Sequence, residues 1–403
     1  MNPTICLRAG AVFDGQRFLT DASVLMDGER IAGVKTGDVR PGASLVIDLA
    51  DRLVMPGLVD LHCDAMEKCL EMRPGVLFET DFAFQNLDQR LAACGITTFC
   101  HALSFADNEL GLRSPEEAEK LVVRIHQHER SGRCAVRHRI HVRYEIGSER
   151  SAQAIERLIA AGRVDLLSFM DHTPGQGQFK TLQSFLDFYT RNYQVAEAEV
   201  ISMVDHKKNN RHRAWEQATR LARQAQDAGI PILSHDDDTP AKVDLVRRLH
   251  AGGCEFPIAL DAAAAAREAG MQVFMGAPNL VRGTSTNGHL KAAEAVEQGL
   301  CEGLISDYYP ECLLQTPFIA KDTLSVRLDL ALRLVGAGPA AFLRDGITCG
   351  RLKPGDPADL VVVDTSEVWK RVVQTWVGGR CVYRADRRFR PYRDRRPAPG
   401  EAA

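Results

Sequence analysis

The stretch Met55–Pro56–Gly57–Leu58–Val59–Asp60–Leu61–His62–Cys63–Asp64 decides the fold class. Its first part, up to Leu61, is an apolar run typical of a buried strand. Two side chains of metal-ligand type, His62 and Asp64, follow directly. In a parallel α/β fold, chemistry gathers where buried strands end, so this stretch sets a pattern to look for along the chain.

The same pattern recurs through the middle of the chain, where apolar strand candidates alternate with amphipathic helical stretches. Eight strands are predicted, at residues 58–61, 97–102, 140–146, 166–170, 231–234, 256–259, 272–276 and 303–306. Helices are predicted between them, at residues 116–132, 152–161, 213–228, 240–251, 262–269, 290–298 and 324–334. Eight strand–helix units predict an α/β fold, a (β/α)8 barrel of TIM type, over residues 53–346.

Both ends of the chain are β-rich. Residues 4–50 and 350–385 read as short strands broken by turns. The run 360–363 is too apolar to be left uncovered, which favours pairing of the two ends over two independent tails. We therefore expect a composite β-sandwich from residues 1–52 and 347–392, the barrel at 53–346, and a disordered tail at 393–403. A chain of 403 residues has room for such a second unit, because single cores stop growing near ~250–300 residues.

Composition excludes several classes of partner. The formal net charge of −3 gives no reason to expect binding to nucleic acid or to an anionic membrane. No run of about 20 apolar residues is present, and the N-terminus does not read as a signal peptide. Eleven cysteines without a CxxC pair are typical of free thiols in a reducing cytoplasm. The oligomeric state is left open, and a homo-oligomer is compatible with the sequence.

Residues able to bind metal follow the predicted strands. Hydrolysis at neutral pH needs a strong nucleophile, which a divalent metal provides by lowering the pKa of bound water toward ~7. Imidazole and carboxylate ligands suit two such ions, with zinc expected first and manganese or iron as alternatives. The predicted ligands are His62, Asp64, Glu145, His172, His235 and Asp307. Glu145 is the candidate for a carboxylate shared by both ions, and Asp307 is also the candidate general base.

Cationic residues near the strand ends indicate the substrate. Lys68, Arg143 and Arg282 are the predicted binding residues for a small anionic, phosphorylated substrate. Arg143 lies two residues before Glu145 and therefore shares its face of the strand. The alternative is that these cations pair with nearby carboxylates. Neither a P-loop nor a GxGxxG motif is present, so a nucleotide cofactor has no support.

Two motifs resemble the amidohydrolase superfamily. MPGLVDLH (55–62) resembles the opening of its barrel, and GRLKPGDPADL (350–360) resembles its return to the β-sandwich. A narrower resemblance is to the PhnM family of phosphonate metabolism, the α-D-ribose 1-methylphosphonate 5-triphosphate diphosphatases. The strings similar to that family are HCDAMEK (62–68), RPGV (73–76), HRIHVRYE (138–145), FMDHTPGQGQF (169–179), LSHDDDT (233–239), MGAPNLVRG (275–283) and SDYYP (306–310).

The resemblance implies cleavage of a 5-triphosphate between its α and β phosphorus atoms, with a 5-phosphate and pyrophosphate as products, in organic phosphonate catabolism by the C–P lyase pathway. It also implies the same six metal ligands. Many amidohydrolases carry a carboxylated lysine after the fourth strand, and residues 169–172 offer none, which supports Glu145 as the shared ligand. The chain departs from the family at Ala65 and in the loop 284–289, where His289 is a candidate replacement for a family histidine.

Two other functions are compatible with the sequence. One is hydrolysis of a C–N bond by the same metals, as in a cyclic amidase, deaminase or deacetylase. The other is a non-catalytic scaffold, although such a protein is expected to have a broken ligand set. The segment 175–210 interrupts the regular spacing and predicts either a lid over the barrel mouth or an ordinary long connection.

Overall fold

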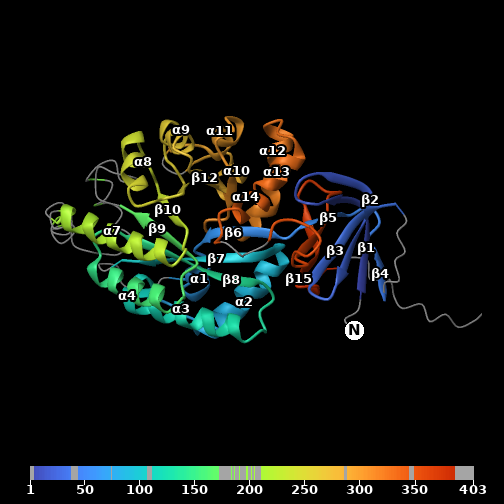
Figure 1. Ribbon diagram of the computed structural model, residues 1–403, viewed down its shortest axis with the longest axis horizontal. Helices are drawn as coiled ribbons and strands as arrows, with labels where there is room; N and C mark the ends of the chain where they lie inside the picture. Colours follow the sequence, from blue (N-terminus) through green and yellow to red (C-terminus); the bar gives the residue numbers. More distant parts are fainter. Residues whose placement is uncertain are drawn as a thin grey trace, which may run out of the picture.

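The computed structural model describes residues 4–37, 44–73, 75–106, 111–171, 210–285, 288–344 and 349–385, with single positions at 183, 186, 190, 197, 201 and 204. Two β-sheets organise these residues. One forms a barrel surrounded by helices, and the other lies at one end of it (Figure 1). The predicted segment 175–210 falls almost wholly outside the described residues, as does the predicted tail 393–403.

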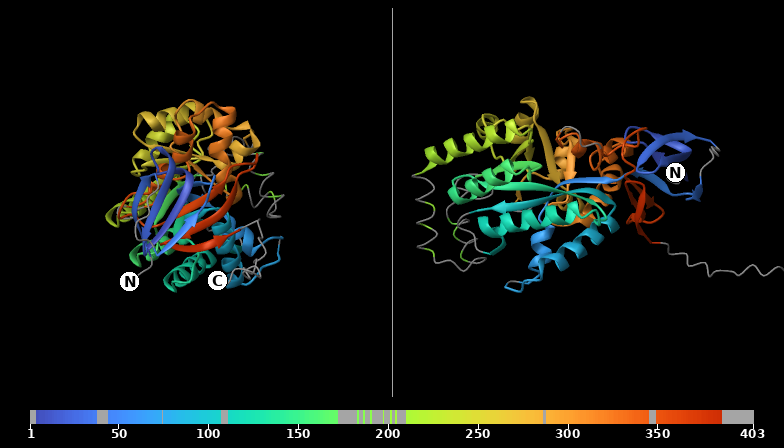
Figure 2. Two further views of the ribbon diagram at one scale, coloured as in Figure 1. Left: turned by 90° about the vertical axis from the view of Figure 1, so that its right-hand side faces the viewer. Right: turned by 60° about the horizontal axis from the view of Figure 1, so that its bottom comes forward.

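The smaller sheet is built from both ends of the chain, as predicted. Its strands are β1 (Thr4–Phe13), β2 (Phe18–Asp27), β3 (Arg30–Thr36), β4 (Leu45–Asp48), β5 (Leu53–Pro56), β14 (Leu360–Asp364), β15 (Arg371–Val377) and β16 (Arg380–Arg384). The C-terminal strands join the N-terminal ones where β14 runs antiparallel to β5, with Leu360 opposite Pro56. Figure 2 shows this sheet in front of the barrel, in blue and red. Its own apolar core includes Val24, Leu360 and Trp376.

The larger sheet is the predicted parallel barrel. Its strands, in the order in which they pair, are β6 (Leu58–Cys63), β7 (Ile96–Phe105), β8 (Arg137–Glu145), β9 (Leu166–Met170), β10 (Ile232–His235), β11 (Gly253–Glu255), β12 (Gln272–Gly276) and β13 (Gly303–Ile305). Seven of these overlap predicted strands. The sixth prediction, 256–259, is wrong, because the strand there is β11 and ends at Glu255.

The first and last strands of the barrel are joined by side-chain contacts. The buried Asp60 carboxylate on β6 accepts hydrogen bonds from the Ser306 amide at 3.0 Å and from the Ser306 hydroxyl at 2.5 Å. One residue pair further, Cys63 forms an isolated parallel bridge with Asp307. These contacts bring the residues after β6 and β13 together at the carboxyl end of the barrel.

Helices cover the outer face of the barrel (Figure 1). Seven of them overlap the predicted helices. They are α3 (Pro115–Arg130), α4 (Glu149–Ala160), α7 (Arg211–Asp227), α8 (Pro240–Arg247), α9 (Leu260–Glu268), α11 (Ala292–Glu297) and α13 (Leu328–Arg333). The others described are α1 (Ala65–Leu70), α2 (Thr80–Ala93), α10 (Ala277–Arg282), α12 (Thr316–Thr323) and α14 (Ala337–Ala340). Local sequence signals fix the start of α3. The Ser114 side chain accepts a hydrogen bond from the Glu117 amide, and Pro115 occupies the first turn.

Glycine is required at two close approaches that shape the barrel. At Gly57 the chain passes from β5 to β6, and a Cβ there would lie 2.2 Å from the Thr97 side chain. At Gly253 on β11, a Cβ would lie 2.7 Å from Leu233 and 2.9 Å from Phe342. Phe342 and Phe274 belong to the apolar cluster that fills the barrel interior. The barrel is therefore a packed core with its open chemistry confined to one end.

Candidate metal centre and active site

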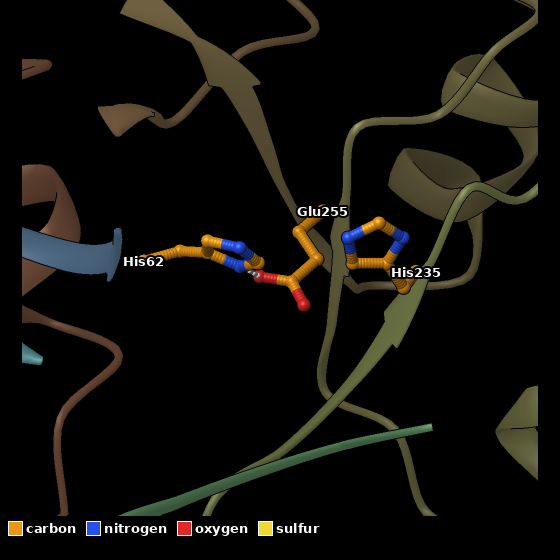
Figure 3. A group of neighbouring side chains, drawn as sticks. All are labelled: His62, His235 and Glu255. Carbon is orange, nitrogen blue, oxygen red and sulfur yellow. Dashed lines mark hydrogen bonds and ion pairs between the residues drawn. The ribbon is translucent and has the colours of Figure 1, made fainter. Parts of the chain in front are cut away.

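Three buried side chains meet at the carboxyl ends of three barrel strands. They are His62 on β6, His235 on β10 and Glu255 on β11, and their candidate ligand atoms all lie within 4.8 Å of one another. His62 Nδ1 lies 2.8 Å from Glu255 Oε2, and the two imidazole rings are 5.6 Å apart between centroids. Figure 3 shows the Glu255 carboxylate between the two rings. Two nitrogens and a carboxylate at this spacing are a suitable donor set for a divalent metal.

Glu255 is the residue that sequence reasoning missed. A strand predicted at 256–259 places Glu255 before the strand, whereas the observed β11 ends on it. Pro257 was a usable signal, because proline cannot donate to a central ladder and argues against a strand through its position. The backbone turns directly after Glu255, where Phe256 has a φ of +55°.

Burial sets the protonation of the His62–Glu255 pair. Desolvation lowers the pKa of His62 to about 3, so the ring is neutral at neutral pH. Burial alone would raise the pKa of Glu255, but the neighbouring rings of His62 and His141 and the His62 hydrogen bond hold it below its ordinary range. At neutral pH the carboxylate is therefore ionised, and the His62 Nδ1–H donates to it.

His141 is a second residue to which the sequence assigned no role. It lies on β8 with no solvent exposure, and its Nδ1–H donates to the Leu61 carbonyl at 2.8 Å. With the ring proton on Nδ1, Nε2 carries the lone pair that could bind a metal. Nε2 lies 3.7 Å from Glu255 Oε1. A backbone carbonyl on one ring nitrogen is the usual support for a histidine that binds metal through the other. The period of two along β8 was the available signal, because His141 shares a face with Arg143 and Glu145.

Asp64 and Asp307 lie together at the junction of β6 and β13. The Asp64 amide donates to the Asp307 carbonyl at 2.7 Å, and the Asp307 amide donates to the His62 carbonyl at 2.9 Å. Burial and the charge of Asp64 raise the pKa of Asp307 to about 7. Burial and Glu67 also raise the pKa of Asp64. Asp307 has a φ of +60°, a conformation that non-glycine residues adopt mainly at constrained sites.

Of the three predicted cations, Arg143 lies deepest in the site. Its Nη2 is 3.4 Å from His235 Nε2, and its charge partly opposes the rise in the pKa of both Asp64 and Asp307. Lys68 is exposed on α1, and its charge also opposes the rise in the pKa of Asp64. Arg282 is exposed at the end of α10.

One further cation, Arg113, was not predicted. Its Nε donates to Glu67 at 2.9 Å, and its Nη2 lies 3.9 Å from Asp64.

Two predicted metal ligands, Glu145 and His172, are not in the group that the described residues form around Glu255. Glu145 is buried at the end of β8, outside the three-residue group around Glu255. His172 lies outside the described residues, and its neighbour Asp171 lies 3.6 Å from the buried Lys242 ammonium.

Comparison with known proteins identifies the family. No family model matches the chain. A curated relative does: the chain is 32% identical over 378 residues to the α-D-ribose 1-methylphosphonate 5-triphosphate diphosphatase of Escherichia coli (strain K12). The match covers 91% of this chain and 100% of the relative. The chain belongs to this diphosphatase family. The family resemblance expected from the MDHTPGQ and MGAPNLVRG strings is thereby confirmed.

Solved structures show the fold. An N-acetyl-D-glucosamine-6-phosphate deacetylase from Mycobacterium smegmatis has a TM-score of 0.66 at 18% identity, covering 94% of this chain and 100% of that one. A structure described as an amidohydrolase has a TM-score of 0.63 at 15% identity, covering 95% and 99%. The ochratoxinase of A. niger has a TM-score of 0.64 at 13% identity, covering 95% and 96%. This chain thus shares the barrel fold of these structures and carries a second β-sheet built from its two ends.

Among the described residues, no helix is both long and apolar enough to cross a membrane.

Proposed function

We propose that this chain hydrolyses α-D-ribose 1-methylphosphonate 5-triphosphate between its α and β phosphorus atoms, releasing the 5-phosphate and pyrophosphate. The observation that carries the proposal is the 32% identity that extends over the full length of a diphosphatase with this name. The site supports it, because a cluster of metal-binding side chains and a deeply placed arginine suit a polyanionic substrate.

The residues of the site fit a divalent metal. The buried atoms that lack a hydrogen-bond partner within the part of the chain that the structure describes include Asp64 Oδ1, His141 Nε2 and Glu255 Oε1. Buried polar atoms are rarely left unpaired, so these point to ligands that the protein itself does not supply. We propose one ion held by His62, His235 and Glu255, with His141 beside them. We propose a second ion near Asp64 and Asp307, where the predicted ligands Glu145 and His172 would complete the set.

Bound divalent metal supplies the Lewis-acid chemistry of the reaction, activating water and polarising phosphoryl oxygens. Mixed imidazole and carboxylate donors suit zinc first, with manganese or iron as alternatives. Two carboxylates are candidates for sharing between the ions: Glu145, as predicted, and Glu255, which lies among three histidines.

Asp307 is proposed as the general base. Its carboxylate stands beside Asp64 at the strand ends, and a carboxylate so placed can take a proton from water and return it to the leaving group. Arg143 is proposed to bind the triphosphate, because its buried Nε has no hydrogen-bond partner among the described residues. Lys68, exposed on α1, adds a second positive charge that acts on Asp64. Arg282 stays a predicted phosphate contact.

We propose a cytoplasmic setting, supported by the cysteines. All eleven are free thiols in the structure, which is typical of proteins kept in a reducing compartment.

The test compares substrates of two reaction classes on metal-loaded protein. kcat/KM is measured for the ribose 1-methylphosphonate 5-triphosphate and for an N-acetylhexosamine 6-phosphate, a C–N substrate suited to the same fold. We expect turnover of the triphosphate alone, abolished by His62→Ala and by Asp307→Asn. Preference for the amide, or full activity in either variant, would overturn the proposal or its site.

A further inference from the structure

A second group of metal-binding side chains lies away from the barrel mouth. Asp88 on α2, Cys134 in the connection between α3 and β8, and His138 on β8 have candidate ligand atoms within 4.8 Å of one another. His138 is the second residue of β8, whereas Glu145 is its last. Seven residues of strand separate them by roughly 23 Å. His138 also points to the opposite face of β8 from His141 and Arg143, outward toward the helices.

Hydrogen bonds hold Asp88 and His138 in place. Asp88 accepts hydrogen bonds from the amides of Ala135 and Val136 at 2.8 and 3.0 Å, and its Oδ1 lies 3.0 Å from His138 Nε2. The His138 ring is buried, and its Nδ1 lies 2.8 Å from His101 Nε2. The carboxylate and the imidazole are therefore positioned before any ligand binds.

Aromatic rings close the inner side of the group. Phe84 lies 4.6 Å from the His138 ring, and Phe99 packs edge-on against His101 at 4.9 Å. Cys134 is half-buried, so its thiol gives the group a side open to solvent through which an ion could enter. The His138–His101 pair matches the support of a metal-binding imidazole, whose second nitrogen donates to a neighbouring acceptor.

We propose that Asp88, Cys134 and His138 form a zinc-type metal site that is separate from the catalytic centre. Thiolate, imidazole and carboxylate together favour zinc over magnesium or calcium, and water would complete a tetrahedral set. Zinc bonds of ~2.0–2.3 Å need ligand atoms somewhat closer than 4.8 Å. Asp88 Oδ1 and His138 Nε2 are already 3.0 Å apart, which is close enough. Cys134, in the connection between α3 and β8, is therefore the residue that would move toward the ion.

Binding is balanced by the release of one proton, from the Cys134 sulfur, which the ion replaces. His138 would bind through Nε2 as the neutral tautomer with its ring proton on Nδ1, and His101 Nε2 would accept that proton while His101 carries its own on Nδ1. Burial and the charge of Asp88 raise the pKa of the Cys134 thiol to about 12, so without metal the sulfur is protonated at neutral pH. The bound ion would tie α2 to the segment that leads into β8, outside the catalytic site.

The test counts zinc in the full chain. Chelator-treated wild type, Cys134→Ser and Cys381→Ser are dialysed against zinc, and bound zinc is measured per chain. Cys381 is an exposed cysteine on β16 and serves as the matched control. We expect wild type and Cys381→Ser to hold one more zinc than Cys134→Ser. With cobalt in place of zinc, a thiolate-to-cobalt charge-transfer band should disappear only in Cys134→Ser.

A second measurement needs no variant. In wild-type protein, zinc should protect Cys134 from alkylation, as followed by peptide mass spectrometry. Equal zinc content in wild type and Cys134→Ser overturns the proposal, and so does alkylation of Cys134 at the same rate with and without zinc. Triphosphate turnover should be unchanged in Cys134→Ser, which separates this site from the catalytic one.

Discussion

Replacement of Glu255 by glutamine tests the site where sequence and structure differ most. The side chain has no solvent exposure and lies 2.8 Å from His62 Nδ1. Glu255→Gln keeps its shape and removes its charge. A change to a residue that merely supports a metal ligand weakens metal binding by about 10- to 100-fold. Loss of a direct ligand should weaken binding by at least the upper limit of that range. We therefore expect the metal dissociation constant to rise at least ~100-fold, which is a loss of roughly 2.7 kcal/mol of binding free energy.

The same substitution should also destabilise the metal-free protein. The fold holds the pKa of Glu255 below its ordinary range, so the ionised carboxylate contributes stability at neutral pH that a neutral amide lacks. The hydrogen bond from neutral His62 also weakens, from about 1.5–3 kcal/mol with a charged acceptor to about 0.5–1.5 kcal/mol with a neutral one. We therefore expect the free energy of unfolding of the metal-free variant to fall by about 1 kcal/mol or more.

Metal affinity is measured by competition with a chromophoric chelator, and stability by urea unfolding with and without metal. Glu302→Gln is the matched control, because this partly buried glutamate precedes β13 at the other end of the barrel and pairs with Arg267 at 2.6 Å. It should leave metal affinity unchanged. Wild-type affinity in Glu255→Gln would refute the placement of Glu255 in the metal centre.

Three further predictions concern the neighbouring residues. Asp307→Asn should lower kcat by about 10²–10⁴-fold, the range for loss of a general base, as measured by steady-state kinetics on metal-loaded protein. In metal-free protein the raised pKa of Asp307, about 7, means that the folded state favours the protonated form. The protonated Asp307 side chain therefore stabilises the fold fully at a pH below the pKa that Asp307 has in the unfolded chain. This stabilisation is lost as the pH rises through 7, and the free energy of unfolding falls by at most about 4 kcal/mol. Urea unfolding should therefore show Asp307→Asn stabilising the metal-free protein more at about pH 8 than at about pH 5, and an equal effect at both would contradict the pKa. Arg143→Gln should raise KM for the triphosphate by about 10- to 100-fold through loss of a charge-assisted hydrogen bond, and an unchanged KM would remove Arg143 from the binding site.

The barrel could be predicted from sequence because its strands are buried on both faces. Seven apolar runs overlap β6–β10, β12 and β13, and a turn or helix follows each. The sixth strand is only three residues long, Gly253–Glu255, and carries no apolar run of its own. The more apolar segment that follows it, 256–259, therefore gives the stronger strand signal. This shift of three residues is what removed Glu255 from the predicted site.

His141 was missed for a different reason. Its neighbours Arg143 and Glu145 stand nearer the strand end, and only the three-dimensional arrangement shows that Leu61 and Glu255 lie on either side of its ring. Contacts between strands that are distant in sequence depend on barrel stagger, which a single sequence does not specify. Arg113 reaches Glu67 by the same kind of long-range placement.

The central claim is that metal-loaded protein cleaves a triphosphate between its α and β phosphorus atoms. Phosphorus NMR of the reaction with ribose 1-methylphosphonate 5-triphosphate tests it most directly, with a chelator-treated sample beside it. We expect pyrophosphate and the 5-phosphate to appear in equal amounts, only when metal is present. Release of orthophosphate as the first product, or an unchanged triphosphate in protein that holds its metal, would contradict the claim.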